Sequence, residues 1–186
     1  FFAKYFRVIA IDTRGQGRST DLTTNNYTYE LFANDLYKII QQLHLTKVNL
    51  VGWSDGGNTA LIFNTQHPEL INKIVTIGAV LNPKGVKEEL TASFKTLIET
   101  PSETTNLRLM QLMLNEPNIT KPDLKKIENR VLVIAGEQDE VKESHTKEIQ
   151  KRILNAELLI VPHSTHYVPF EQPKKLNDAI LKFLKN

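Results

Sequence analysis

A serine flanked by glycines at fixed spacing is the stretch of this sequence best suited to covalent chemistry. Residues 52–56 read Gly-Trp-Ser-Asp-Gly, which fits the pattern Gly-x-Ser-x-Gly. A strand-like run at residues 47–51 leads into the pattern, and a helix-like run at residues 58–63 leads out of it. A serine hydroxyl in such a strand–turn–helix setting is placed to act as a nucleophile. The pattern therefore predicts that Ser54 is a nucleophile.

The spacing of the two glycines has a physical reason. A serine hydroxyl is a weak nucleophile and must be exposed and accurately aimed, which a very sharp turn achieves at the cost of backbone strain. Side chains two residues to either side of the serine would crowd one another, so Gly52 and Gly56 suit the turn. The helix that starts at the serine would offer unpaired N–H groups, which favour negative charge. The alternative is an ordinary glycine-rich loop between a strand and a helix.

A nucleophilic serine needs a base, and five histidines are available for that role. His44 and His67 end helix-like runs, where an imidazole commonly caps the last carbonyls, and His145 lies within a predicted helix. His163 and His166 follow the last strand-like run, at the same sheet edge where Ser54 should project. These two histidines are therefore the candidate bases.

The base in turn needs an acid that orients it, and the acid should also follow a strand. Asp139 does so, after the run at residues 130–135, and Glu137 and Glu140 are rivals on distance alone. The alternative role for Asp139 is that of a helix N-cap, which aspartate favours strongly. No acidic residue follows the run at residues 73–77 closely, which leaves the loop of Asp139 as the best position for the acid.

The elements that must position these residues alternate between strand-like and helix-like runs. The strand-like runs are short, nearly continuously apolar and rich in Val and Ile, as expected for a parallel sheet buried on both faces. They are residues 7–11, 48–51, 73–77, 130–135 and 158–161. Helix-like runs cover residues 28–45, 141–153 and 173–184. We therefore expect an α/β fold, with a mostly parallel sheet and flanking helices.

Residues 82–129 interrupt this alternation. The segment carries four prolines and two apolar helical patches, and it predicts a small helical cap over the carboxyl edge of the sheet, where ligand sites of open α/β sheets lie. The alternative is a pair of surface helices packed on the core. The chain would then consist of a first core part at residues 1–81, which holds the serine turn, the cap at residues 82–129, and a second core part at residues 130–186.

The composition narrows the possible functions. The chain has 186 residues with 40% hydrophobic and 24% charged residues, which is ordinary for a globular protein. Its net charge of +2 comes with scattered basic residues, so we expect no nucleic-acid partner. The absence of cysteine excludes disulfides, a cysteine nucleophile and thiolate metal sites. No apolar run reaches membrane-spanning length and no signal peptide is visible, so we expect a cytoplasmic protein.

Four motifs, in order along the chain, resemble those of a known family. Residues 12–19 fit D-x-R-G-x-G-x-S, residues 52–57 fit the serine turn, residues 136–139 fit an acid loop, and residues 162–173 fit P-x-x-x-H-x-x-x-x-E-x-P. The chain resembles the α/β-hydrolase fold serine hydrolases of the esterase and lipase type. The sequence of residues 52–57, Gly-Trp-Ser-Asp-Gly-Gly, is also similar to the serine turn of the valacyclovirase, or biphenyl hydrolase-like, branch.

The resemblance implies a Ser-His-Asp triad and an acyl-enzyme mechanism, with no cofactor and no metal. In the family's last motif, His166 and not His163 takes the histidine position. The resemblance therefore implies that Ser54 attacks a small-molecule ester, that His166 takes the proton and that Asp139 orients the imidazole. The backbone N–H of Asp55 would supply one oxyanion donor. Neighbouring activities with the same triad are carbon–carbon bond hydrolysis, lactone hydrolysis and haloperoxidase-like perhydrolysis. A ligand-binding protein of the same fold without catalysis is the alternative from another class.

Two residues beside the serine are candidates for substrate binding. The carboxylate of Asp55 could attract the amino group of an amino-acid ester, although its alternative role is to favour the helix dipole. Trp53, the only tryptophan, would line the pocket or pack beneath the turn.

The resemblance also predicts a part of the fold that these 186 residues do not contain. It begins at the fourth strand of the family, and it implies about three further strands upstream, one of them between residues 7–11 and 48–51. The loop after that strand would supply the second oxyanion N–H. We therefore expect this chain alone to fold poorly, with exposed strand edges, and to be nearly inactive.

Overall fold

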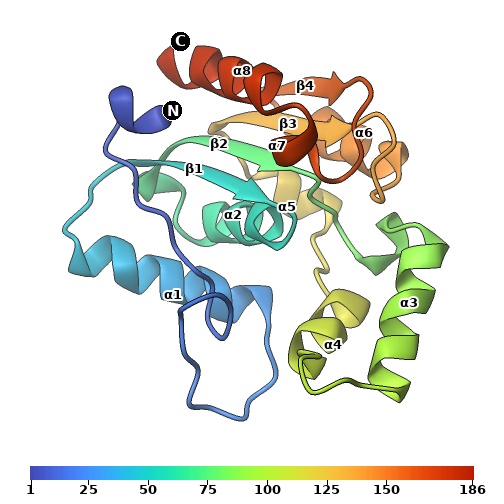
Figure 1. Ribbon diagram of the computed structural model, residues 1–186. Coiled ribbons are helices and arrows are strands. Elements are labelled where there is room, and N and C mark those ends of the chain that lie inside the picture. The colour runs from blue at the N-terminus through green and yellow to red at the C-terminus, as the bar shows by residue number, and fades with distance from the viewer.

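Four parallel strands form the sheet, and their order in space follows their order in the sequence (Figure 1). The strands are β1 (Val48–Trp53), β2 (Ile71–Ile77), β3 (Arg130–Gly136) and β4 (Ala156–Val161), in a computed structural model that describes residues 1–186. Each strand pairs in parallel with the next, so all four carboxyl ends lie at one edge of the sheet. This confirms the expected α/β fold and brings the loops after the strands together.

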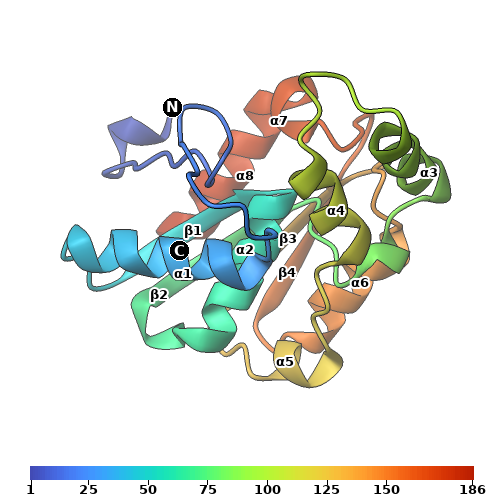
Figure 2. The same ribbon diagram turned by 90° about the horizontal axis from the view of Figure 1, so that it is seen from below.

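Helices cover both faces of the sheet (Figures 1 and 2). On one face lie α1 (Tyr29–Gln42), α2 (Asp55–Gln66), α5 (Lys121–Lys125) and α6 (Glu143–Arg152), and on the other lie α7 (Val168–Glu171) and α8 (Pro173–Lys185). Two further helices, α3 (Glu88–Glu99) and α4 (Leu107–Asn115), complete the set, together with the short 3₁₀ turns η1 (Phe2–Lys4), η2 (Pro68–Leu70) and η3 (Pro83–Gly85).

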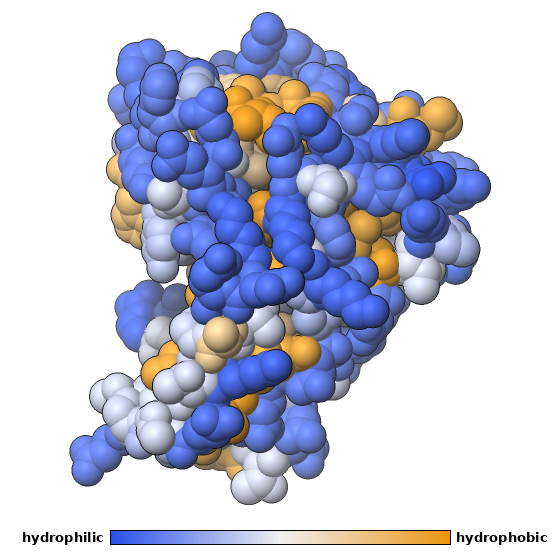
Figure 3. Space-filling model, turned by 90° about the vertical axis from the view of Figure 1, so that its right-hand side faces the viewer, coloured by the Kyte–Doolittle hydropathy of each residue, from blue (hydrophilic) through white to orange (hydrophobic).

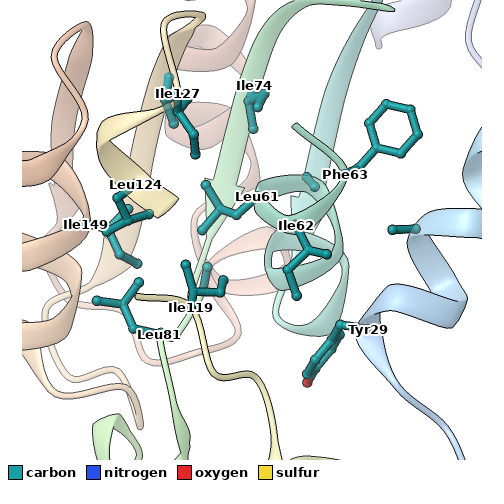
Figure 4. Close-up of a cluster of buried hydrophobic side chains, with 14 of the residues drawn as sticks. Tyr29, Leu61, Ile62, Phe63, Ile74, Leu81, Ile119, Leu124, Ile127 and Ile149 are labelled. Carbon is teal, nitrogen blue, oxygen red and sulfur yellow. The ribbon is translucent and has the colours of Figure 1, made fainter. Parts of the chain in front are cut away.

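Alternating side chains of the strands divide the core into two clusters. Along β2, Ile74 joins the cluster with α1 and α2, whereas Val75 joins the cluster with α7 and α8. Val131 and Leu132 of β3 divide in the same way, because successive side chains of a strand point to opposite faces. Figure 4 shows the larger cluster, in which Leu61 of α2 meets side chains from several helices. Burial on both faces explains why the central strands β2 and β3 read as continuous apolar runs, whereas the edge strands β1 and β4 are partly exposed.

The predicted strand at residues 7–11 is wrong. The structure gives these residues no strand, and Val8 and Ile11 are about half exposed. β1 is the edge of the sheet, and a cleft of about 650 Å³ separates it from residues 9–14. A strand is stabilised by the hydrogen-bond ladder to a neighbour, and residues 7–11 have no neighbour to pair with. Their apolar pattern alone therefore does not make a strand.

The region predicted as a cap contains two different packings. α3 and α4 pack against each other and stand away from the sheet, on the side to which the strands run (Figure 1). α5 instead packs on α2 and α6, and Leu124 and Ile127 are fully buried in the core. Arg108 of α4 fastens this helix to the loop before α1, through an ion pair with Asp21 and stacking on Tyr27.

None of the helices combines the length and the apolar composition that crossing a bilayer requires. The face shown in Figure 3 is mostly hydrophilic, with apolar patches between the hydrophilic residues.

Candidate active site

Ser54 occupies the turn between β1, which ends at Trp53, and α2, which begins at Asp55. Its backbone has φ 54° and ψ −118°, a conformation that non-glycine residues rarely adopt. A Cβ atom on Gly52 would lie 2.2 Å from the carbonyl carbon of Gly56, so only glycine fits at residue 52. A Cβ atom on Gly56 would meet nothing within 4 Å, so the expected crowding at residue 56 is wrong. The sharp turn therefore requires glycine two residues before the serine and not two residues after it.

The start of α2 leaves two backbone donors beside the serine. The N–H groups of Gly57 and Asn58 both donate to the carbonyl of Ser54, whereas those of Asp55 and Gly56 have no partner. Free N–H groups at a helix start favour a negatively charged group nearby. The N–H of Ser54 itself donates to the carbonyl of Ile77 at 2.7 Å, which fixes the turn against the end of β2.

Asp139 lies in the loop after β3 and is only 4% exposed. Its carboxylate accepts from the backbone N–H groups of Gly136 at 3.2 Å and Val141 at 3.0 Å. Oδ1 of Asp139 also lies 2.8 Å from Nδ1 of His166. The alternative role as a helix N-cap is wrong, because α6 begins at Glu143 and Lys142 precedes it. The carboxylate is thus held from the main chain and aimed at the imidazole.

The acid loop (residues 137–140) and the histidine loop (residues 162–167) are joined by several further hydrogen bonds. Glu137 accepts from the N–H of His163 at 3.0 Å, and the N–H of Gln138 donates to the carbonyl of Ser164 at 2.9 Å. Glu140 accepts from the N–H of His166 at 3.1 Å. Each residue of the acid loop therefore contacts the histidine loop, and Asp139 is the one that meets the imidazole.

The imidazole of His166 lies beside the serine turn. A Cβ atom on Gly78, the residue after Ile77, would lie 2.6 Å from Cε1 of His166. Since Ile77 also accepts from the N–H of Ser54, one short stretch of chain contacts both the serine and the histidine. The rings of Trp53 and His166 lie 5.8 Å apart between centroids. The hydroxyl of Ser54 makes no hydrogen bond to the ring, and such contacts often form only when substrate binds.

The two residues that flank Ser54 make different contacts. The indole N–H of Trp53 donates to the backbone carbonyl of His166 at 2.8 Å, and its ring packs edge-on against Tyr167 and Phe170. Oδ1 of Asp55 accepts from the hydroxyl of Tyr29 at 2.5 Å, whereas its other oxygen makes no hydrogen bond. Trp53 thus contacts the histidine loop, and Asp55 contacts the start of α1.

Charges around the imidazole set its protonation. Burial lowers the pKa of His166, but the hydrogen bond and charge of Asp139, with the charges of Glu140 and Asp55, outweigh burial and raise the pKa above 6.5. Burial also raises the pKa of Asp139, but its bond to His166 and its backbone donors lower the pKa below its usual value. For Asp55 burial prevails, so its pKa is raised even though Tyr29 and His166 oppose this. The pair of Asp139 and His166 therefore favours a carboxylate beside an imidazole that binds a proton readily.

Asp139, Glu140 and His166 also form the one group of residues with the spacing of metal ligands. One ligand atom from each lies within 4.8 Å of the others. The hydrogen bond between Nδ1 of His166 and Asp139 accounts for this proximity, and a cation at this point would have to replace that proton.

Three contributors to the site were not identified from the sequence. Glu140 was weighed only as a rival acid, whereas in the structure it holds the backbone of His166. Gly78 has φ 62° and leaves room for the imidazole, and a glycine directly after the run at residues 73–77 was the available signal. Tyr29, which holds Asp55, carried no signal beyond its place at the start of a predicted helix.

Known proteins resemble this chain along almost its whole length. Residues 2–115 match the sequence profile described as the alpha/beta hydrolase fold. RutD from Caulobacter sp. (strain K31), whose name describes a carbamate hydrolase, is 27% identical over 96% of this chain and 81% of its own. The serine hydrolase BPHL from Homo sapiens is 28% identical over 98% of this chain and 70% of its own. The structure of a meta-cleavage product hydrolase from Pseudomonas fluorescens IP01 superposes with a TM-score of 0.84 at 21% identity, over 99% of this chain and 81% of that one.

Proposed function

The chain belongs to the alpha/beta hydrolase fold family, and from this premise we propose that it is a serine hydrolase that cleaves a small-molecule ester. The nucleophile is Ser54, the base is His166 and the orienting acid is Asp139. The observation that carries the proposal is the 2.8 Å pair of Asp139 and His166, which lies against the turn that holds Ser54 in a strained backbone conformation. Strain at a partly exposed serine beside a paired imidazole is typical of an activated nucleophile.

The proposed reaction follows from these positions. The hydroxyl of Ser54 attacks the ester carbonyl while Nε2 of His166 takes its proton, and the Nδ1–H of His166 donates to Asp139. The alcohol leaves with the proton from His166, and an acyl group stays on Ser54. Water, activated in turn by His166, then releases the acid. Asp139 remains a carboxylate throughout and stabilises the imidazolium.

The backbone N–H of Asp55 is the proposed donor to the oxyanion. It belongs to the first residue of α2 and has no partner within the chain, so its hydrogen-bonding capacity is available to a ligand. The positive end of the helix dipole supports the same charge. Loss of one such donor typically lowers turnover by about 10²–10³-fold, which is the contribution assigned to this group.

The side chain of Asp55 is the proposed determinant for substrates that carry an amino group. Its Oδ1 is occupied by Tyr29, whereas the other oxygen is free of hydrogen bonds within the chain. Its role at the helix start is the alternative, which predicts no preference among esters. We expect Asp55→Asn to weaken the turnover of α-amino esters more than that of simple acyl esters, and equal losses would leave only the helix role.

Labelling with a fluorophosphonate probe tests the proposed nucleophile and base. A fluorophosphonate reacts once with an activated serine and needs no turnover, so we expect the chain to be labelled even where its turnover is slow. We expect the label to disappear in both Ser54→Ala and His166→Asn. The matched control is His163→Asn, which changes an exposed histidine of the same loop and should label as the unmodified chain does. Because asparagine tolerates the positive φ of residue 163, this control should keep the loop intact.

Each outcome of the labelling experiment is informative. Labelling that survives Ser54→Ala would assign the nucleophile to another residue. Absence of labelling in a chain that unfolds cooperatively would favour a ligand-binding protein of the same fold. Labelling followed by turnover of lactones or of carbon–carbon substrates, and not of esters, would keep the triad and change the substrate class.

A further inference from the structure

A single hydrogen bond joins the serine turn (residues 52–57) to the histidine loop (residues 162–167). It runs from the indole N–H of Trp53 to the backbone carbonyl of His166, at 2.8 Å. The other bonds of the histidine loop lead to the acid loop, to Val161 at the end of β4, or stay within the loop and α7. The residue directly before Ser54 is therefore the one that connects the serine side of the site to the histidine side.

His166 is held at three points, and each point fixes a different part of it. Asp139 holds the ring at Nδ1, Glu140 holds the backbone N–H, and Trp53 holds the backbone carbonyl. The first two partners belong to the acid loop and move with it. Trp53 is the one of the three that fixes His166 relative to β1, the strand directly before Ser54. Loss of this bond would let the backbone of His166 shift away from the serine turn, and the shift would turn its imidazole out of line with Asp139.

The surroundings of Trp53 show that its N–H matters in addition to its apolar ring. Tyr167 and Phe170 pack on the indole at 5.7 Å between centroids, yet they are 53% and 72% exposed. These contacts bury little apolar surface, so apolar packing at this end of the indole contributes little stability. The hydrogen bond to His166 is the directional contact that the residue makes here.

We propose that Trp53 is a positioning residue, whose indole N–H sets the position of His166 relative to Ser54. The role in catalysis rests on the proposed function, whereas the contact itself can be tested without activity. As the sole tryptophan, Trp53 also reports on this contact, since all tryptophan fluorescence of the chain comes from residue 53. An imidazolium close to an excited indole accepts an electron from it and quenches its emission, and a neutral imidazole quenches far less. The rings lie 5.8 Å apart, close enough for this effect.

The first experiment measures the tryptophan fluorescence of the whole chain as a function of pH. We expect emission to fall in one step as His166 takes up a proton, to keep this step in His163→Asn, and to lose it in His166→Asn. A step that persists in His166→Asn, or no step in the unmodified chain, would overturn the proposed contact. This measurement does not depend on turnover.

The second experiment removes the N–H and keeps the ring. Biosynthetic replacement of tryptophan by β-(3-benzothienyl)alanine changes only residue 53, because the chain has no other tryptophan, and it exchanges the N–H for sulfur at nearly the same shape. Trp53→Phe makes the same test with a smaller ring. The matched control is Phe170→Leu, which alters an exposed aromatic contact of Trp53 but not the hydrogen bond.

Removal of the N–H should loosen the pairing of His166 with Asp139. We expect the pKa of His166, followed by NMR of its ring protons, to fall towards its ordinary value, because the partner that raises the pKa is less well placed. The rate of fluorophosphonate labelling should fall by up to about 100-fold, with little change in KM for p-nitrophenyl acetate. Phe170→Leu should leave both quantities nearly unchanged.

The two measurements separate the contact from the proposed function. An unchanged pKa of His166 after loss of the N–H would overturn the positioning role, and so would a labelling rate equal to that of the unmodified chain. If the unmodified chain is not labelled at all, the hydrolase proposal and the catalytic part of this inference fall together. The fluorescence step and the NMR titration would still decide whether Trp53 positions the imidazole.

Discussion

The two sides of the site are held in place by different means. On the serine side the conformation of the main chain fixes the geometry, since Ser54 has a left-handed backbone and Gly52 has no room for a side chain. On the histidine side, acceptor groups of Glu137, Asp139 and Glu140 hold the loop that carries His166. The comparison teaches that changes in side-chain chemistry should act mainly on the histidine side, and added bulk mainly on the serine side.

The largest expected effect is on the histidine side, from Asp139→Asn. This variant keeps the shape of the side chain but no longer favours the tautomer that leaves Nε2 free to take a proton, so we expect kcat to fall by about 10⁴-fold. The matched change is Glu140→Gln, which keeps an oxygen that can accept from the N–H of His166. Steady-state turnover of a model ester measures both. Losses of equal size would show that the two acids act together and that Asp139 has no separate role.

The next effect is on the serine side, from the two glycines of the turn. Gly52→Ala would place a methyl group inside the backbone of residue 56, so we expect its free energy of unfolding to fall by about 1–3 kcal/mol or more. Gly56→Ala adds a methyl group in open space near a helix start, and it should be neutral or stabilise by up to about 1 kcal/mol. Urea unfolding of both variants measures the difference. Equal destabilisation would mean that the turn is less tight than its geometry indicates.

The smallest effect expected is a pH dependence that distinguishes activity from stability at His166. The proposed base, His166, must be neutral to act, and its pKa is raised above 6.5, so kcat/KM should fall tenfold per pH unit below a midpoint higher than that value. A raised pKa means that the folded state binds the proton more tightly. The stability from this pairing is therefore full below the unfolded pKa and is lost as pH rises through the folded pKa.

Activity and this part of the stability thus run in opposite directions with pH. Rate profiles and unfolding curves recorded at the same pH values check both, and His166→Asn should remove the pH-dependent part of each that comes from this residue. A midpoint below 6.5 would show that burial prevails over the charges of Asp139, Glu140 and Asp55.

The sequence predicts correctly those features that depend on the apolar pattern of one segment or on a residue's place directly after a strand. The four strands of the sheet were predicted within two residues of their observed ends, because each is a short apolar run, which burial on both faces requires of the central strands β2 and β3. Asp139 and His166 were expected to meet because both follow strands of one sheet edge, and they lie 2.8 Å apart. The division into core and cap at residues 82–129 stays a prediction.

Sequence reasoning failed where the outcome depends on a distant partner. Residues 7–11 have the composition of a strand, but a strand needs a neighbour, and the pattern of one segment cannot show whether the neighbour is present. The bonds from Glu140 and Trp53 to the backbone of His166 depend on the path of a loop with a positive φ at His163, which no local pattern specifies. The open space at Gly56 depends in the same way on what lies across from the turn.

The left-handed backbone of Ser54 has a practical consequence for anyone who would improve this protein. Glycine adopts φ 54° freely, so exchanging the serine for glycine should relieve strain of about 1 kcal/mol or more while it removes the hydroxyl of the proposed nucleophile. A library selected for heat resistance alone would therefore enrich a version of the chain that lacks the proposed nucleophile. Selection for thermal stability must therefore be combined with a screen for turnover from its first round.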